Sequence, residues 1–508
     1  MTLANTNVYA CLVCGKYFQG RGKSSPVYTH SLELGHQVFA NLHTAKFYCL
    51  PDGYLIEDPA LDDIKYNINP TYTKEDVVRL GPGGALPVPT LEPGVRYIPG
   101  LVGLNNIKKN DWLNVIVQAL SQATPLRDFF LIETNTEACK SQLVQTFGLL
   151  FRRIWSSRAF KGHVSPQVFL QAVSDASDRK FRAGTQCDAA QFLVWLLNQL
   201  HRDLGGTAKR GSSIIYTTFQ GELRVEVTKP SSATSNEEKK DTPSDHTTHE
   251  EDMEAEEPAP QDDNAMTAHG ASAPPVTTKI QHVPFLVLPI QLPFAPVFAE
   301  AKTRSLIHQV KLMDLLEAFA GKKVAELPNG ETRKMWISRL PRYLWLHVKR
   351  FTTNTVGVEK NNTLVTFPLE NLSLEKCIYK ASLPSHAELA SLSVSELLAR
   401  RAKLLRKPAS QDETNRPLEK SELVKEVRSL LEASMDNMRK AGYSLVANIV
   451  HEGNDIPNGS FYCHILNRAN GMWYEARDLS ITSPEGMAQL VALSQAYIQL
   501  YELQPSRT

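Results

Sequence analysis

The sequence GLNNIKKNDWLNVIVQAL, residues 103–120, joins a loop rich in glycine and asparagine to a helical apolar pattern. Large apolar side chains recur at helical spacing after the loop, at Trp112, Val115, Ile116, Ala119 and Leu120. The spacing predicts a helix that begins near Asp111. Unpaired N–H groups and the helix dipole favour negative charge at such a start, so a reactive side chain is often found there. Taken alone, Asp111 is more simply an ordinary helix N-cap.

The chain has 508 residues, a formal net charge of +1 and seven cysteines. Its length allows two or three domains with hydrophobic cores. The near-zero charge gives no overall electrostatic reason to expect a nucleic acid or a membrane as partner. The longest apolar stretch, VPFLVLPIQLPFAPVF (residues 283–298), contains four prolines and is too short to cross a bilayer as a helix. Scattered cysteines in odd number, without a secretory signal, indicate a reducing compartment such as the cytosol or nucleus.

Composition changes along the chain predict two domains. A block rich in Cys, His and aromatic residues suggests a small domain over residues 1–80, and the Gly/Pro-rich GPGGALPVPTLEPG suggests a linker over 81–96. Helical and strand-like patterns alternate over 97–505, which predicts an α+β domain. Two insertions interrupt it. Residues 229–279 are acidic and poor in large apolar residues, which predicts disorder, and 384–440 have the leucine spacing of inserted helices.

The first block contains a candidate metal site. Cys11 and Cys14 form a C-x2-C pair, and His30 and His36 follow with five residues between them. Two thiolates and two imidazoles suit tetrahedral Zn²⁺, and a small loop-rich domain usually needs such a metal for stability. The four ligands leave no open position, so the predicted zinc is structural. The alternative is four unrelated residues in a reduced domain. His43 and Cys49 are interpreted as packing or supporting residues, or as remnants of another site.

The sequence of this block resembles the ubiquitin-protease-type zinc finger. The resemblance lies in YACLVCGKYFQGRG and in the later VYTHSLELGHQVFANLHTAKFYCLPDGYLIED. Members of that family often bind the free C-terminal tail of ubiquitin through an arginine, a tryptophan and a tyrosine. Lys16 stands where the binders tend to carry arginine, and the block has no tryptophan. Lysine lacks the planar guanidinium group with which arginine donates two hydrogen bonds to one carboxylate. We therefore expect a finger that has kept its fold rather than its tail binding.

The second domain resembles the ubiquitin-specific proteases. GLNNIKKNDWLN is similar to their cysteine box, GTQCDAAQFLVWLLNQL to their Gln-Gln-Asp-Ala helix, and YSLVANIVHEG leads into their histidine box. LPRYLWLHVKRF, NTLVTFPL and AYIQLYEL match characteristic strands in the same order. The resemblance implies a papain-like fold with fingers, palm and thumb. The fingers of active relatives usually hold zinc on two C-x2-C pairs, and the matching segments here contain no cysteine.

Transferring the family's catalytic residues to this sequence predicts a protein that is not an enzyme. Asp111 stands in the place of the nucleophilic cysteine, and Ser460 in the place of the general-base histidine. In the family, the acid that orients the histidine usually lies four residues after the tryptophan of the histidine box. Counting from Trp473, that position is Arg477, and Asp478 is next to it. Only Asn106, the oxyanion-stabilising residue, is retained. A thiolate needs a base and an orienting acid to react near neutral pH, so losing all three abolishes the thiol chemistry.

Other residues near these motifs receive structural roles. His451 is interpreted as a structural residue of its strand. Cys187 is interpreted as a small buried residue, because no histidine-containing motif is expected to lie beside it and activate its thiol. In the resembling fold, the cysteine box and the histidine box face each other across the cleft. We therefore expect Asp111 and Arg477 to interact across it, with Lys108 or Lys109 as further partners of the carboxylate.

The zinc finger next to a protease domain without its triad most resembles the inactive ubiquitin-protease homologues of the spliceosomal tri-snRNP. That resemblance implies a nuclear scaffold of pre-mRNA splicing that helps to assemble or stabilise the tri-snRNP and join it to the pre-spliceosome. Its partners would be tri-snRNP proteins, with RNA contacted indirectly or within the ribonucleoprotein, and no membrane. One alternative is a module that binds ubiquitin without cleaving it. The other, a residual isopeptidase, is disfavoured by the triad substitutions.

Overall fold

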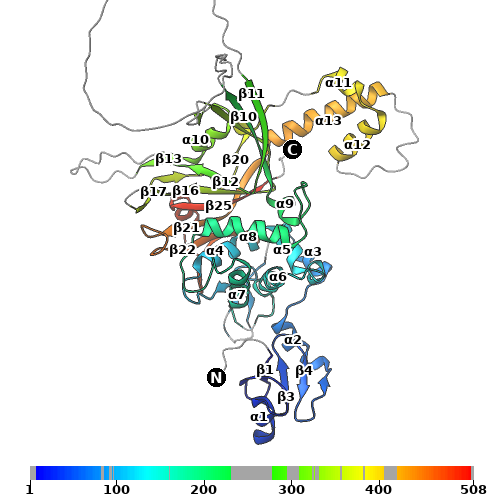
Figure 1. Ribbon diagram of the computed structural model, residues 1–508, viewed down its shortest axis with the longest axis vertical. Helices are drawn as coiled ribbons and strands as arrows, with labels where there is room; N and C mark the ends of the chain where they lie inside the picture. Colours follow the sequence, from blue (N-terminus) through cyan, green and yellow to red (C-terminus); the bar gives the residue numbers. More distant parts are fainter. Residues whose placement is uncertain are drawn as a thin grey trace, which may run out of the picture.

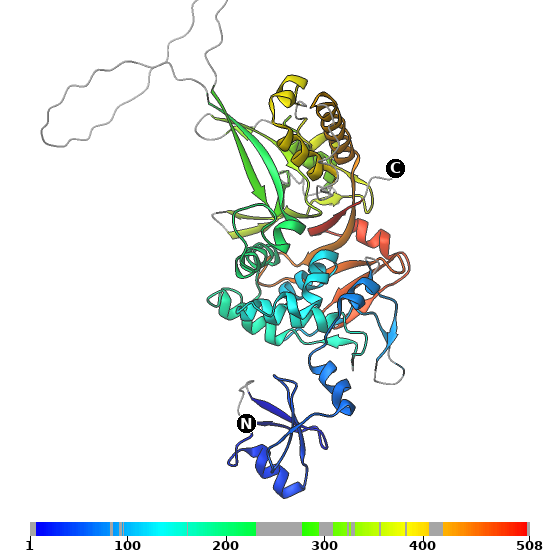
Figure 2. The same ribbon diagram turned by 90° about the vertical axis from the view of Figure 1, so that its right-hand side faces the viewer.

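The computed structural model describes residues 7–81, 85–90, 94, 96–159, 161–229, 277–293, 308–322, 325–326, 331–354, 357–380, 384–405 and 420–504. The chain forms a small N-terminal lobe, a large central body and a helical projection (Figures 1 and 2). Most of the predicted acidic insertion, residues 229–279, lies outside the described residues. Over the described ranges, none of the helices combines the length and the apolar character that crossing a bilayer requires.

The N-terminal lobe is a five-stranded antiparallel sheet with one helix. The strands, in the order β2-β1-β3-β4-β5, are β1 (Val8–Cys11), β2 (Tyr17–Gln19), β3 (Val38–Asn41), β4 (Phe47–Cys49) and β5 (Leu55–Ile56). Helix α1 (Pro26–Leu34) begins after Ser25, whose side chain accepts a hydrogen bond from the Tyr28 N–H. It ends at Gly35, where φ is +67°, a conformation that favours glycine. The lobe has its own small core around Val27 and Phe39.

Two short helices connect this lobe to the body, α2 (Asp62–Ile68) and α3 (Lys74–Leu80). The Arg153 guanidinium donates to the Ile68 carbonyl oxygen at 2.8 Å, and the Asn69 amide donates to Glu133 at 3.3 Å. Val77 of α3 belongs to the core of the body. Helix α3, predicted to be the last part of the finger domain, therefore packs on the body, because its apolar side chain is buried there.

A lobe of helices forms one half of the body (Figure 1). Its helices are α4 (Asp111–Ser121), α5 (Thr124–Leu131), α6 (Gln142–Ile154), α7 (Gln167–Ala176), α8 (Ala189–Asp203) and α9 (Ile214–Phe219). The predicted helix beginning near Asp111 is confirmed as α4, and each of its residues is buried. Trp112 in its first turn packs edge-on against Phe192 of α8, with ring centroids 4.8 Å apart. Helix α4 is thus the central helix, which fixes the position of the loop before it.

The other half of the body is a mixed sheet in the order β12-β16-β25-β21-β22-β23-β24. Its strands are β12 (Val287–Gln291), β16 (Tyr343–Lys349), β21 (Gly442–Glu452), β22 (Ser460–Asn467), β23 (Met472–Arg477), β24 (Ser480–Thr482) and β25 (Ala496–Leu503), with β20 (Leu372–Ser373) paired to β21. Side chains alternate between its two faces. Phe461, Cys463 and Ala476 share one core with α4, whereas Trp473 and Tyr443 share a second core with α10 (Leu312–Leu316) and α14 (Met487–Leu493).

A second, antiparallel sheet extends from the body in the order β11-β10-β15-β14. It contains β10 (Gly221–Lys229), β11 (Thr277–Phe285), β14 (Ala325–Glu326) and β15 (Thr332–Arg339). Four short pairs complete the strands: β6 (Val88–Pro89) with β7 (Arg96–Tyr97), β8 (Gly103–Leu104) with β9 (His163–Val164), β13 (Gln309–Lys311) with β19 (Leu364–Thr366), and β17 (Phe351–Asn354) with β18 (Gly357–Lys360). The β6–β7 pair shows that part of the predicted linker, residues 81–96, has strand structure.

The range 384–440 contains three helices, α11 (His386–Ser391), α12 (Val394–Leu405) and α13 (Lys420–Lys440). They project from the body beside the second sheet (Figure 1). Apolar side chains from all three form a separate core: Leu389, Leu397, Leu423, Val424 and Val427. The leucine spacing of this range thus corresponds to packing among the helices themselves.

Candidate functional site

The structure brings Cys11, Cys14, His30 and His36 together in the N-terminal lobe, with one ligand atom of each within 4.8 Å of all the others. Cys11 Sγ lies 3.5 Å from His36 Nδ1, and Cys14 Sγ lies 3.4 Å from His30 Nε2. The two imidazole nitrogens are 3.1 Å apart. Ligand atoms of a tetrahedral zinc stand about 3.3–3.8 Å from each other. The residues therefore fit a closed Zn²⁺ site, in which the metal would cross-link the C-x2-C turn to α1 and the loop after it.

A surface pocket of about 510 Å³ lies elsewhere on the same lobe. Its lining includes Tyr9, Arg21, Lys23 and Tyr28, but not Lys16. The Arg21 guanidinium lies 4.0 Å from the centre of the Tyr48 ring and donates to the Gly53 carbonyl oxygen at 3.2 Å. Lys16, which follows the C-x2-C pair where tail-binding fingers tend to carry arginine, lies outside this pocket. The fold instead brings Arg21 to the pocket, through the turn after β2, which sequence spacing did not reveal.

Asp111 is the first residue of α4 and is nearly buried. Its Oδ2 accepts hydrogen bonds from the Phe461 main-chain N–H at 2.7 Å and from Gln186 Nε2 at 3.0 Å. Burial raises the pKa of the Asp111 carboxyl above its ordinary value, and these hydrogen bonds oppose that shift. One carboxylate therefore connects α4, the loop before α8 and strand β22.

The Asn106 side chain is part of a network of amides. Its Nδ2 donates to Asp478 Oδ2 at 3.0 Å, and its Oδ1 accepts from the Asn110 N–H at 3.0 Å. Asn114 donates to the other oxygen of Asp478 at 3.2 Å, and Asn110 donates to Asn114 Oδ1 at 3.0 Å. Asn110, Asn114 and Asp478 were not among the predicted site residues. The spacing of Asn106, Asn110 and Asn114 by four was the signal that could have revealed the two asparagines, whereas no local signal pointed to Asp478.

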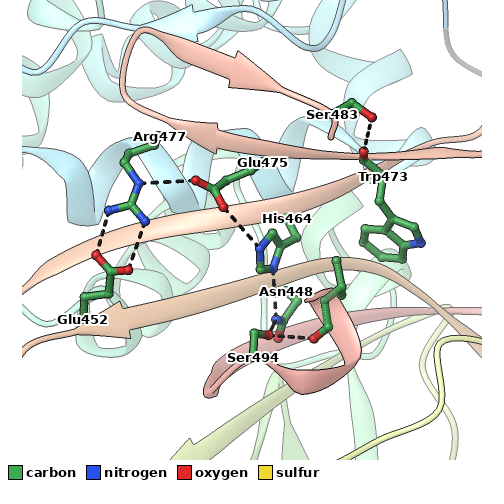
Figure 3. A network of polar contacts seen from close by, with 9 residues as sticks. Asn448, Glu452, His464, Trp473, Glu475, Arg477, Ser483 and Ser494 are labelled. Carbon is green, nitrogen blue, oxygen red and sulfur yellow. Dashed lines mark hydrogen bonds and ion pairs between the residues drawn. The ribbon is translucent and has the colours of Figure 1, made fainter. Parts of the chain in front are cut away.

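The predicted contact between Asp111 and Arg477 is wrong. Arg477 donates to both carboxylate oxygens of Glu452, at 2.7 and 3.1 Å, and lies 3.4 Å from Glu475 (Figure 3). Its guanidinium also stacks over the Tyr462 ring. Strand alternation is the reason: Ala476 points into the α4 core, so Arg477 points to the other face, and Asp478 beyond the strand turns back to Asn106.

Ser460 is the first residue of β22 and is paired in register with Glu452. The alternation along β21 and β22 places it on the same face as Tyr462, His464 and Asn448. Figure 3 shows this face, where His464 lies between Glu475 and Asn448. Ser460 therefore belongs with the Glu452–Arg477 ion pair rather than with the core around α4.

Two histidines near the histidine-box strands are held neutral. Burial, followed by the charge of Arg477, lowers the pKa of His464 to about 4. Burial, followed by the charge of Lys360, lowers the pKa of His451 to about 4. Neither ring nitrogen of the buried His451 has a hydrogen-bond partner in the described part of the chain, and its ring packs against Phe351 and Phe461. By its surroundings His451 is a packing residue of the sheet, whereas His464 contacts Glu475 at 3.7 Å and Asn448 at 3.4 Å.

Cys187, which was expected to be buried, is only half-buried. Its thiol points to the Thr185 carbonyl oxygen at 3.5 Å, and burial raises its pKa. Burial also raises the pKa of the Cys463 thiol. Outside the N-terminal lobe, no cysteine is hydrogen-bonded to an imidazole among the described residues. The described residues around Asp111 and Arg477 thus form carboxylate–amide and carboxylate–guanidinium contacts.

Comparison with known proteins identifies the class of protein. Residues 102–501 match the family model of ubiquitin carboxyl-terminal hydrolases, and residues 2–61 match the model of the zinc finger found in ubiquitin hydrolases and other proteins. The chain belongs to the ubiquitin carboxyl-terminal hydrolase family and carries its zinc-finger module. The predicted α+β fold, a ubiquitin-protease-type finger followed by a ubiquitin-specific-protease fold, is confirmed.

Individual relatives cover nearly the whole chain. The human protein named ubiquitin carboxyl-terminal hydrolase 39 is 36% identical over 512 residues, covering 99% of this chain and 76% of the relative. A Schizosaccharomyces pombe protein named probable mRNA-splicing protein ubp10 is 33% identical over 509 residues, covering 99% of this chain and 84% of the relative. A crystal structure described as an essential yeast splicing factor has a TM-score of 0.64 at 22% identity, covering 99% of this chain and 94% of the other, and shares the fold.

Proposed function

We propose that this protein is a non-catalytic scaffold of pre-mRNA splicing, acting in the nucleus on the assembly or stability of the spliceosomal tri-snRNP and on its joining to the pre-spliceosome. The similarity, over 99% of this chain, to a relative named as a probable mRNA-splicing protein supports the process. The tri-snRNP as partner rests on the resemblance of the finger and the cysteine-box segment. Zn²⁺ has a structural role in this proposal, held by the four Cys and His residues of the finger.

The observation that carries the non-catalytic part is the set of contacts of Asp111. Its carboxylate stands at the start of the central helix, where active family members carry the nucleophile, and accepts hydrogen bonds from Phe461 N–H and Gln186. A carboxylate that attacks an amide would have to form an anhydride, and one stabilised by two donors is a weak nucleophile. Ser460 cannot accept a proton at neutral pH, and Arg477 is bound to Glu452. No described group supplies the base that thiol chemistry requires.

The same contacts favour a rigid scaffold. Asp111 bonds to the main chain of β22, and Asp478 bonds to Asn106 and Asn114 on the helical side. These bonds join the helical lobe and the sheet at two points on one former cleft. Charge-assisted hydrogen bonds of this kind each contribute about 1.5–3 kcal/mol. In this proposal, residues that once served catalysis fix the relative position of the two lobes.

Two parallel assays test the proposal. The protein is removed from nuclear extract, and purified wild-type protein is added back while tri-snRNP abundance and splicing of a reporter transcript are measured. We expect restoration of both by wild type and by Asp111→Asn. In the second assay, neither protein releases a fluorogenic group from ubiquitin. Failure to restore the tri-snRNP would contradict the scaffold role, and turnover that survives Asp111→Ala would contradict the loss of catalysis.

A second candidate function is ubiquitin binding without cleavage, which the pocket containing Arg21 favours. A guanidinium held against Tyr48 beside a pocket could bind a free carboxylate. Titration of ubiquitin into the full chain tests this candidate, with Arg21→Ala as the disrupting variant and Lys16→Ala as the matched control outside the pocket. The candidate is supported if Arg21→Ala abolishes binding and if ubiquitin without its last two glycines does not bind the wild type. Equal binding by Arg21→Ala and Lys16→Ala would contradict it.

A further inference from the structure

Five basic side chains gather on two loops beside the start of α4. Lys108 and Lys109 lie in the loop before the helix, and Arg179, Lys180 and Arg182 lie in the loop between α7 and α8. All five are exposed. We call these five residues the basic cluster. The loops are far apart in sequence, so the cluster is a product of the fold.

Three hydrogen bonds hold the loops side by side. The Gly184 N–H donates to the Lys108 carbonyl oxygen at 2.8 Å. The indole N–H of buried Trp112 points to the Lys109 carbonyl oxygen at 2.9 Å and to the Thr185 carbonyl oxygen at 3.2 Å. One core tryptophan therefore anchors both loops, and the positions of the five cations follow from the packing of α4.

The backbone of these loops adopts uncommon conformations. Lys108 and Lys109 have φ of +90° and +54°, and Asp178 and Arg179 have φ of +50° and +63°. Side chains other than glycine rarely adopt this region, and such strain is found most often at functional sites. Here it turns the lysine carbonyl oxygens inward to Gly184 and Trp112, while the side chains remain in solvent.

The described part of the chain supplies no ion pair to the basic cluster. Among the described residues, none of the five has a carboxylate within ion-pair distance. Arg182 donates to the Thr185 hydroxyl at 3.2 Å, and the Lys180 ammonium lies 5.3 Å from the Phe181 ring centre. The nearest acids in sequence are Asp175 and Asp178, which are exposed, and Asp111, which is nearly buried and hydrogen-bonded to Phe461. Five cations against the two exposed carboxylates of Asp175 and Asp178 leave a local positive field in a chain whose net charge is only +1.

We propose that the basic cluster binds the phosphate backbone of an RNA strand. Lysine and arginine side chains on fixed loops contact phosphates without reading sequence. The only aromatic side chain in the two loops, Phe181, is buried, so the cluster offers no surface for base stacking. The positive charge by itself would also attract an acidic peptide. The choice of RNA rests on the proposed role in splicing, where the protein works within a ribonucleoprotein.

The test uses the full zinc-loaded chain and a fluorescent single-stranded RNA of mixed sequence. In one variant, Lys108, Lys109, Arg179, Lys180 and Arg182 are all replaced by glutamine. A matched control replaces five exposed cations elsewhere, Lys46, Lys65, Arg400, Lys420 and Lys425, by glutamine. We expect at least about tenfold weaker binding at low salt for the first variant, with the dependence of log K on log salt reduced by about 0.7 for each lost phosphate contact. The control should keep wild-type affinity.

Folding controls and competing ligands decide between the possible results of the RNA-binding test. Thermal melting shows whether each variant folds, and the triple variant Lys108→Arg, Lys109→Arg and Lys180→Arg should retain RNA binding if the first variant does not fold. RNA affinity equal in wild type and the glutamine variant would overturn the proposal. Polyglutamate that binds the cluster as tightly as RNA would overturn it in favour of an acidic protein partner. The add-back splicing assay remains a separate readout, so a failed RNA contact is distinguishable from a failed scaffold role.

Discussion

Asp111 and Phe461 are 350 positions apart in the sequence, and the carboxylate of one accepts the main-chain N–H of the other at 2.7 Å. The bond joins the first turn of the central helix to the strand that begins at Ser460. It gives the Asp111 carboxylate, which we propose stands in the place of the family's nucleophile, a structural partner. The stability of the whole body should therefore depend on Asp111.

Replacing Asp111 by alanine should lower the free energy of unfolding by about 3–6 kcal/mol, because Phe461 N–H and Gln186 each lose a charge-assisted hydrogen bond in a buried place. Arg477→Ala should cost under about 1 kcal/mol, since its ion pair with Glu452 is largely in solvent. The two residues share no partner, so their effects should add within about 0.5 kcal/mol. Urea unfolding of both single variants and the double variant measures this, and strong coupling would contradict the separate locations.

The Asp111→Asn variant should reveal the raised pKa of Asp111. Because the folded pKa lies above the unfolded one, the ionised carboxylate weakens stability above the folded pKa, and this cost disappears as the pH falls through it. As the pH is lowered from 7 toward the ordinary carboxyl pKa, the free energy of unfolding of the wild type should therefore rise relative to that of Asp111→Asn. Denaturant unfolding of both proteins at several pH values tests the sign. The comparison cancels the titration of all other groups, and an opposite trend would mean that hydrogen bonding outweighs burial.

Metal analysis should find Zn²⁺ bound to Cys11, Cys14, His30 and His36. Cys14→Ser should abolish this site and unfold the N-terminal lobe, because its small core depends on the cross-link. The body should keep its melting temperature, since its cores contain only α3 from the N-terminal part. Two separate transitions by calorimetry, of which one is lost on chelation, would agree with this. Simultaneous melting of both parts would contradict it.

Restoring the two reactive residues should not restore an efficient enzyme. In the double variant Asp111→Cys and Ser460→His, the new imidazole would share a sheet face with Arg477 and Glu452, which already bind each other. A guanidinium beside the imidazole lowers its pKa, and no free acceptor orients the ring. We expect a thiol that alkylating reagents modify but little release of a fluorogenic group from ubiquitin. Robust cleavage would show that the remaining cleft is intact.

Deleting residues 231–273 should not destabilise the protein. Strands β10 and β11 pair without a break from Gly221↔Phe285 to Lys229↔Thr277, so the described residues that flank the segment, Lys229 and Thr277, lie opposite each other. A much shorter connection lowers the loop-closure entropy, which would add up to about 2 kcal/mol of stability. Thermal melting of the deletion variant checks this. A large drop in melting temperature would show that the segment packs on the folded protein.

Local patterns in the sequence were enough for several conclusions. The helix at Asp111 follows from apolar spacing within one segment, and it is confirmed as α4. Motif order along the chain predicted the fold, which is confirmed, because each motif belongs to a single strand or helix. The C-x2-C pair and the two following histidines are brought together within one small lobe, where the intervening chain is too short to separate them far.

The partners of the site residues were decided by the tertiary structure. The strand period of two turns Arg477 toward Glu452 and Asp478 toward Asn106, and a count of positions from Trp473 could not give that direction. Arg21 reaches the finger pocket through a turn, and Lys108 meets Gly184 through the anchoring of Trp112. Such contacts depend on long-range packing of buried side chains. The sequence gives the identity of each residue. Which other residue it contacts depends on which helices and strands pack against each other in the folded protein.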